Sequence, residues 1–188
     1  MERIRDLNAA AAPRPVLKKV PLFFGAVRFH ETVLALPFAY MGMVLAAEGL
    51  PTWHQFFWIT LAMVSARTLG MSANRVVDRF IDARNPRTME RHLPLGLLRP
   101  ADLMALAAVS AAVLFVAAAQ LDVLALALAP VAAAYLVGYP FTKRFTWMAN
   151  LALGGALAIA PSGAWIGVRG SLSWEPVLLS SAVAAWAG

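Results

Sequence analysis

The sequence predicts an all-α fold, a polytopic bundle of transmembrane helices. Of the 188 residues, 61% are hydrophobic and 14% are charged, whereas a soluble domain carries about 25% charged residues. The apolar residues gather in long runs, and a membrane-spanning helix needs roughly 20 such residues. None of these runs alternates between apolar and polar residues as the strands of a membrane barrel do. Helices are then the remaining way to satisfy the backbone hydrogen bonds in lipid.

Six apolar runs are candidate membrane helices. They cover Leu22–Ala47, Trp53–Asn74, Asp102–Gln120, Leu121–Tyr139, Met148–Val168 and Trp174–Gly188. Only the residues AQLD separate the third run from the fourth, so we expect a tight antiparallel hairpin there. The sixth run stops after about 14 apolar residues, too few to span a bilayer. We therefore expect an N-terminal fragment in which residues 22–188 form a transmembrane domain that is incomplete at its C-terminus.

The first 21 residues predict a polar tail in front of the membrane domain. They contain three prolines and lead to Lys18 and Lys19. The apolar run that follows is longer than the core of a secretory signal peptide, and no convincing A-x-A cleavage site comes after it. We therefore expect residues 1–21 to be a cytoplasmic tail and the first helix to be retained.

Positive charges predict the orientation of the helices. Most of them lie before the first run and in alternate loops, at Arg3, Arg5, Arg14, Lys18, Lys19, Arg75, Arg79, Arg84, Arg87, Arg91, Arg99, Lys143 and Arg144. The opposite loops hold a single arginine, Arg169. Because cytoplasmic loops are enriched in Lys and Arg, we expect the N-terminus and these basic loops to be cytoplasmic. The net charge of +6 is then a topology signal, and we expect no nucleic-acid partner.

Three polar residues recur at an even spacing where the second run ends. Asn74, Asp78 and Asp82 stand at positions i, i+4 and i+8, so on a helix their side chains form one slightly drifting column. Two carboxylates and an amide oxygen suit Mg²⁺, which takes its remaining ligands from water and substrate phosphates. The chain has no cysteine, which excludes a thiolate metal site. Polar residues at membrane depth are costly and usually functional.

Arginines surround this column. Their planar guanidinium groups match phosphate oxygens, so carboxylates for Mg²⁺ beside arginines for phosphate indicate a diphosphate carried by a lipid tail. We expect Arg75, Arg87, Arg91, Lys143 and Arg144 to bind that diphosphate. The alternative is that these charges form ordinary surface ion pairs at helix ends, or, for Lys143 and Arg144, that they only set the topology.

Three segments carry a pattern of a known family. NRVVDRFIDARNPRT, followed by RHLPLG, resembles the first aspartate-rich motif and the following loop of the UbiA superfamily of intramembrane prenyltransferases. FHETVLALPFAYMGMVLA is similar to the opening helix of that family. YPFTKRFTWMANLALGGALAIAPSGAWIGVRGSL is similar to its loop between helices four and five and the helix after it. The matches cover residues 22–175 in the family's order, and they fit the bacterial 4-hydroxybenzoate polyprenyltransferase-like branch.

The resemblance implies a nine-helix bundle with a central cavity that is capped on the cytoplasmic side. It implies Mg²⁺-dependent transfer of a polyprenyl group from polyprenyl diphosphate to an aromatic acceptor such as 4-hydroxybenzoate. The setting would be ubiquinone or menaquinone biosynthesis in the bacterial inner membrane. Asn74, Asp78 and Asp82 would then be the catalytic first Mg²⁺-diphosphate motif. In the family a second aspartate motif follows helix six, beyond this chain, so we expect the fragment alone to be inactive.

One departure from the family lies within the motif itself. The commonest family pattern has an aspartate directly after the asparagine, where this chain has Arg75. One carboxylate is thereby lost, and a cation that could bind phosphate is gained.

Other polar residues leave their roles open. Arg28 could receive the carboxylate of a hydroxybenzoate-like acceptor, or it could pair with Glu31 three residues later. Tyr139 could donate a hydrogen bond to phosphate or to a ring substituent, or it could be an interfacial tyrosine. Arg67 lies seven residues before Asn74, on the same helix face and deeper in the membrane. Both a structural role and a substrate-binding role remain open for it.

Two kinds of rival function remain. Within the family, the acceptor could be a naphthoate, a haem, a tocopherol precursor or a chlorophyllide. Outside it, the chain could be part of a membrane transporter or a non-catalytic scaffold. A transporter predicts paired polar residues near the bilayer middle and broken helices in an inverted repeat, neither of which the sequence shows.

Overall fold

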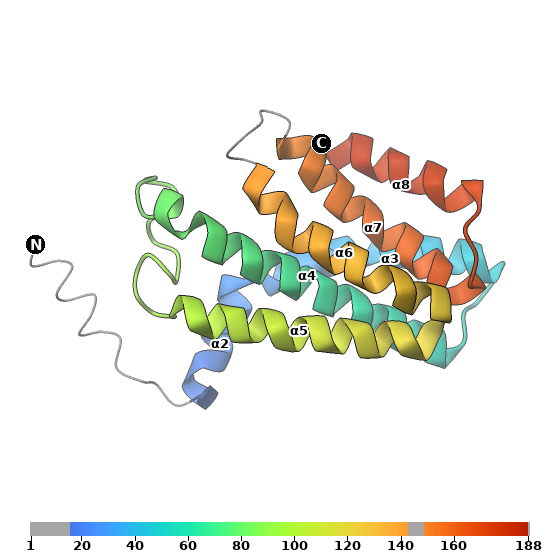
Figure 1. Ribbon diagram of the computed structural model, residues 1–188, viewed down its shortest axis with the longest axis horizontal. Helices are drawn as coiled ribbons and strands as arrows, with labels where there is room; N and C mark the ends of the chain where they lie inside the picture. Colours follow the sequence, from blue (N-terminus) through green and yellow to red (C-terminus); the bar gives the residue numbers. More distant parts are fainter. Residues whose placement is uncertain (1–15, 143–148, 188) are drawn as a thin grey trace, which may run out of the picture.

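The chain forms a bundle of long antiparallel helices (Figure 1). The computed structural model describes residues 16–142 and 149–187, and over these residues all regular structure is α-helical. The helices are α2 Val16–Ala26, α3 Phe29–Ala47, α4 Trp53–Asp82, α5 Pro100–Leu121, α6 Val123–Thr142, α7 Ala149–Arg169 and α8 Trp174–Ala187. The five helices α3 to α7 are long and apolar enough to cross a membrane. The predicted transmembrane helix bundle is thus confirmed.

The first predicted helix is two helices. The apolar run Leu22–Ala47 breaks at Val27 and Arg28, because Arg28 adopts a left-handed backbone conformation with φ 48° that cannot continue a right-handed helix. α2 begins at Val16, inside the segment predicted as a tail, and lies near the start of α5 (Figure 1). Lys19 of α2 forms an ion pair with Asp102 of α5 at 2.7 Å.

α4 is the longest helix and carries the predicted column. Its start is fixed by a capping box, in which Thr52 Oγ1 accepts a hydrogen bond from the backbone of Gln55 and Gln55 Oε1 accepts one from that of Thr52. Its 30 residues give a length of about 45 Å, against roughly 30 Å of hydrocarbon in a bilayer. The helix runs past the predicted end at Asn74 to Asp82, so the column projects toward one end of the bundle.

Close packing joins the remaining helices. The expected hairpin between α5 and α6 is present, with only Asp122 between the two helices. α3 and α7 pack side by side, and a Cβ added to Gly42 would lie 2.3 Å from the carbonyl oxygen of Pro161. That distance leaves no room for a larger residue. The buried cluster here joins these two helices to α4 and is formed by Ala39, Met43, Ile59 and Ala164.

Candidate functional site

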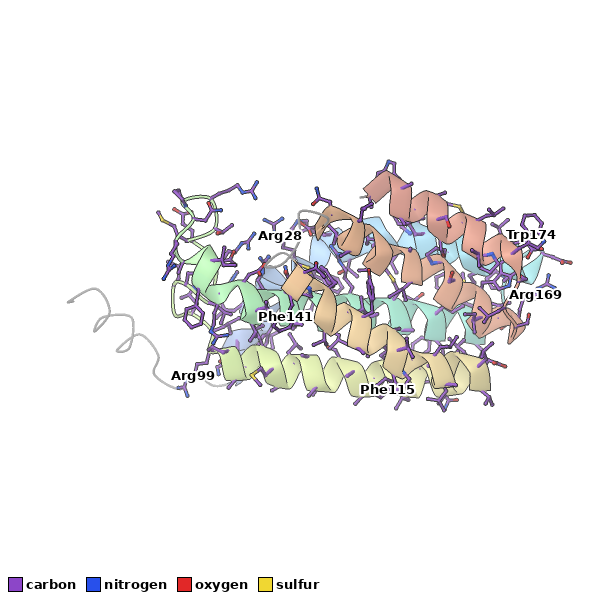
Figure 2. The ribbon with its side chains drawn as sticks, turned by 45° about the horizontal axis from the view of Figure 1, so that its top comes forward. Arg28, Arg99, Phe115, Phe141, Arg169 and Trp174 are labelled. Carbon is purple, nitrogen blue, oxygen red and sulfur yellow. The ribbon has the colours of Figure 1, made fainter. Side chains whose placement is uncertain are left out.

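The column lies at the end of the bundle that carries the 83–99 loop, which joins α4 to α5. Figure 2 shows Arg28 and Arg99 at this end, and Arg169 and Trp174 at the opposite end. Asp78 and Asp82 are buried, with relative exposures of 7% and 5%, and Asn74 is half-buried. All three belong to one continuous helix, so their spacing places them on one face.

The 83–99 loop supplies a cation to the column. Arg91 Nη1 lies 2.7 Å from both carboxylate oxygens of Asp82, and the Arg91 side chain is 26% exposed. The hydroxyl of Thr88, itself buried, donates a hydrogen bond to the backbone oxygen of Asp82 at 3.0 Å. The loop therefore folds back on the end of α4 and neutralises its last carboxylate. An ion pair at a helix end was the alternative interpretation of these charges, but Asp82 lies nine residues before Arg91, so the spacing did not predict this partner.

The same loop packs against α2. Leu98 is buried with Ala26 and Leu103, and the imidazole of His92 lies close to Gly25, where an added Cβ would be 2.9 Å from His92 Cε1. Burial and the nearby Arg75 guanidinium hold the pKa of His92 below its ordinary value. In contrast, Arg87 of this loop is exposed.

Arg75, which stands beside the column in sequence, anchors the break between α2 and α3. Its side chain is buried at 6% exposure, and its Nε donates a hydrogen bond to the backbone oxygen of Ala26 at 2.9 Å. Ala26 is the last residue of α2, so its carbonyl lacks a helical partner. Arg75 thus satisfies a helix end from α4, and its role toward a diphosphate stays a prediction.

A second charged group links α3 to α4 below the column. Arg28 forms an ion pair with Glu31 at 2.6 Å, which was one of the two alternatives predicted for it. Arg67 approaches the other carboxylate oxygen of Glu31 at 3.1 Å. The Nε of Arg67 is buried and has no hydrogen-bond partner among the residues that the structure describes. The Glu31–Arg67 pair was not predicted, because it joins helices that are distant in sequence.

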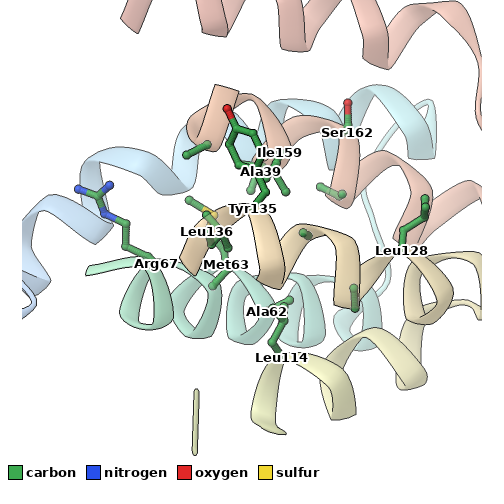
Figure 3. Close-up of a pocket in the computed structure, with 18 of the residues that line it drawn as sticks. Ala39, Ala62, Met63, Arg67, Leu114, Leu128, Tyr135, Leu136, Ile159 and Ser162 are labelled. Atoms are coloured by element: carbon green, nitrogen blue, oxygen red, sulfur yellow. The ribbon is translucent and has the colours of Figure 1, made fainter. Parts of the chain in front are cut away.

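An apolar cavity of about 480 Å³ extends from Arg67 into the bundle (Figure 3). Residues of α4, α5, α6 and α7 line it, together with Ala39 of α3. Nearly all are aliphatic, and the polar side chains among them are Arg67, Tyr135, Tyr139 and Ser162. The α4 part of the lining runs from Ile59 to Met71, a length of about 18 Å. Tyr139, a predicted substrate residue, is buried in this wall.

The donor set at the column suits a hard divalent cation. Asp78 and Asp82 supply carboxylate oxygens and Asn74 an amide oxygen on one helix face, and Mg²⁺ prefers such ligands with water and phosphate completing its shell. A cluster of three or more His, Cys, Asp or Glu residues is absent from residues 16–142 and 149–187, so the protein ligands would be few. Lys143 and Arg144 lie outside the described residues.

The sequence matches a known protein family and several of its members. Residues 35–188 match the model of the UbiA prenyltransferase family. The chain is 28% identical to a 4-hydroxybenzoate octaprenyltransferase of Aliivibrio fischeri over 90% of its own length and 61% of that protein. With a protein of the same name from Vibrio vulnificus it shares 31% identity, over 82% of its own length and 55% of the relative. It thus spans about three fifths of such relatives.

Solved structures of similar fold agree with the family match. An apo structure of a UbiA homologue from Aeropyrum pernix K1 superimposes with a TM-score of 0.78 at 32% identity, covering 84% of this chain and 60% of the other. A structure of digeranylgeranylglyceryl phosphate synthase also gives 0.78, at 15% identity, over 89% of this chain and 59% of the other. The second likeness bears on the fold alone. Together with its apolar helices, these matches make the chain a multi-pass integral membrane protein.

Proposed function

The chain belongs to the UbiA prenyltransferase family, and we propose that it transfers a polyprenyl group from polyprenyl diphosphate to an aromatic acceptor such as 4-hydroxybenzoate. One observation carries the proposal. α4 holds a column of buried carboxylates at its end and, within a turn of that column, the wall of an apolar cavity. A substrate with a charged diphosphate and a long hydrocarbon tail has these same two parts.

The diphosphate would lie at the column. Asn74, Asp78 and Asp82 would hold Mg²⁺, which when bound supplies Lewis-acid stabilisation of the leaving phosphate oxygens. Arg87 and Arg91 of the 83–99 loop, with Arg75, Lys143 and Arg144, would add positive potential for the charge that develops as the C–O bond breaks. The arginines are well suited because their planar donor groups match phosphate oxygens.

The hydrocarbon tail would occupy the cavity. Its lining is almost wholly aliphatic, and ligand sites of roughly 300–1,000 Å³ are typical of proteins. An electron-rich ring carbon of the acceptor forms a bond to the allylic carbon, the diphosphate leaves, and the ring then loses a proton. An apolar wall helps this chemistry because water would otherwise capture the cation-like carbon.

The acceptor would lie between the column and the cavity. Arg67 and Tyr139 line the cavity at this level, and the Arg67 Nε has no hydrogen-bond partner within the described residues. A carboxylate such as that of 4-hydroxybenzoate would complement the cations Arg28 and Arg67, which already share Glu31. The names of the relatives from Aliivibrio and Vibrio support this acceptor over a naphthoate, haem, tocopherol or chlorophyll type.

The biological setting follows from the same argument. We place the reaction in ubiquinone or menaquinone biosynthesis in a bacterial inner membrane, with the N-terminus and the mouth of the site facing the cytoplasm. The basic residues at the loop end of the bundle, such as Arg84, Arg87 and Arg99, support this orientation.

The test is a transfer assay with the full-length protein in membrane vesicles. Polyprenyl diphosphate and labelled 4-hydroxybenzoate should give a prenylated product that disappears with EDTA and returns with added Mg²⁺. A parallel panel of naphthoate and haem acceptors identifies the preferred ring. Turnover of no acceptor in the panel would overturn the proposal and favour a scaffold or transporter, and turnover that persists in EDTA would remove Mg²⁺ from it.

A further inference from the structure

We propose that Arg91 couples metal binding to diphosphate binding by competing with the metal for Asp82. The inference rests on the proposed function, since it concerns the same column. It assigns to Arg91 a positioning role beyond phosphate binding. In the absence of the diphosphate the guanidinium holds the carboxylate, and the diphosphate releases it by offering the arginine another anion.

The competition follows from geometry. Arg91 Nη1 lies 2.7 Å from both Oδ1 and Oδ2 of Asp82, so one donor faces both oxygens that a cation would use. Asp82 is 5% exposed, which leaves little of the carboxylate open on another side. A divalent cation that binds these oxygens must therefore displace the guanidinium or accept a like charge in direct contact, and like charges repel strongly at partly buried sites.

Moving the Arg91 guanidinium away from Asp82 costs free energy, and binding of the metal alone leaves the guanidinium without an anion. Removing one partner of a largely buried ion pair is destabilising, because the other is left as an uncompensated charge. The Arg91 side chain is only 26% exposed, so water replaces the lost carboxylate incompletely. Diphosphate oxygens are strong acceptors for guanidinium groups. Metal and diphosphate should therefore bind together more tightly than either binds alone.

The exchange requires only a side-chain movement. The backbone on either side of Arg91 is held by hydrogen bonds, since its N–H donates to the oxygen of Thr88 at 3.1 Å and its own oxygen accepts from Leu95 at 3.0 Å. Thr88 is in turn bound to the end of α4. The loop can thus keep its fold while the guanidinium turns from Asp82 to a neighbouring phosphate.

Metal binding can be measured directly with Mn²⁺, by electron paramagnetic resonance of the purified full-length protein. We compare free Mn²⁺ with the preformed Mn²⁺–pyrophosphate complex. The wild type should prefer the complex by about 5–150-fold, the usual range of coupling between sites. Arg91→Gln should bind free Mn²⁺ at least several-fold more tightly than the wild type, and its preference for the complex should shrink. Arg91→Lys keeps the charge and should retain most of the preference.

Arg84→Gln is the matched control, because Arg84 lies in the same loop but is exposed and is assigned no part of the diphosphate site. It should leave the affinity for free Mn²⁺ unchanged. Arg91→Met replaces Arg91→Gln if thermal unfolding shows that the latter does not fold. If Arg91 only binds phosphate, the wild type and Arg91→Gln should have the same affinity for free Mn²⁺. That result would overturn the inference. That result would not change the outcome of the vesicle assay for prenyl transfer. The proposed function and the role of Arg91 can therefore be refuted independently.

Discussion

The two halves of α4 differ in the kind of surface that they present to the rest of the bundle. Residues 59–71, the cavity half, face an apolar space with aliphatic side chains and a single arginine, Arg67. Residues 74–82, the column half, bury two carboxylates and Arg75. One helix therefore presents a hydrocarbon surface and a charged surface within about 35 Å, with only Ser72 and Ala73 between them.

The difference shows what each surface requires from its surroundings. Aliphatic side chains need only to be kept from water, so the cavity half works with plain helix neighbours. A buried charge is costly unless it is paired, so the column half needs specific partners. The 83–99 loop provides Arg91 and Thr88 for Asp82, and α2 offers the Ala26 carbonyl to Arg75. The longest irregular segment among the described residues, the 83–99 loop, lies at the column.

The largest effect should follow from removing charge in the column half. Asp78→Asn keeps the size of the side chain but loses a charged metal ligand, and we expect kcat/KM for prenyl transfer to fall by about 100-fold or more. The membrane-vesicle assay measures this at saturating Mg²⁺. Glu90→Gln, which changes an exposed acid of the neighbouring loop, should have little effect. Equal losses in the two variants would mean that general charge, not the column, is responsible.

Much of this comparison could be predicted from the sequence, because its signals are local. Length and composition identify the apolar helices, and the spacing of Asn74, Asp78 and Asp82 places them on one face of a helix. The short AQLD connection predicts the α5–α6 hairpin, which the structure confirms. In each case the signal lies within a single helix or between neighbouring ones.

The rest depends on contacts between distant segments. The break between α2 and α3 was missed because the left-handed residue is Arg28, whereas glycine, asparagine or aspartate would have signalled that conformation. The run of apolar residues continues across the break. The pairs Arg91–Asp82 and Arg67–Glu31 depend on how the loop and helices pack. A cavity has no local sequence pattern, since the same alanines and leucines would equally fill a core.

A smaller effect should follow from filling the cavity half. Ala62 lines the cavity from α4 (Figure 3), and Ala62→Phe would place a ring in the space assigned to the tail. We expect kcat/KM with an octaprenyl donor to fall at least about tenfold, with a much smaller loss for a geranyl donor. Ala108→Phe, on an exposed face of α5, is the control. A loss that is equal for both donors would remove the tail from this cavity.

A still smaller effect concerns the wall between α6 and α7. Tyr135 donates a hydrogen bond to the Ala152 oxygen at 3.0 Å, and a Cβ added to Gly155 would lie 2.3 Å from its hydroxyl oxygen. Gly155→Ala should therefore break that bond at a cost of about 1 kcal/mol, which offsets the stability that alanine otherwise adds over glycine in a helix interior.

A double-mutant cycle sharpens this prediction. Tyr135→Phe removes the clashing atom, so Gly155→Ala should cost less in that background, with a coupling of about 1 kcal/mol. Gly163→Ala is the control, because an added Cβ there meets no heavy atom of the described residues within 4 Å. Thermal unfolding in detergent measures the four proteins of the cycle and the control, and strictly additive effects would show that the tyrosine hydroxyl does not limit position 155.

The smallest effect is a pH dependence at the loop beside the column. Burial and the Arg75 charge keep the pKa of His92 below its ordinary value of 6.5, so the unfolded chain binds the proton more readily than the folded one. The stability from a neutral His92 is then present above about pH 6.5 and is lost as the pH falls through the lower folded pKa. His92→Gln should flatten the fall of the melting temperature between about pH 7 and pH 5. His54→Gln, an exposed histidine on α4, should leave the slope unchanged. If the slope survives in His92→Gln, other groups control the acid response, and the loop does not owe its pH sensitivity to its contact with Gly25.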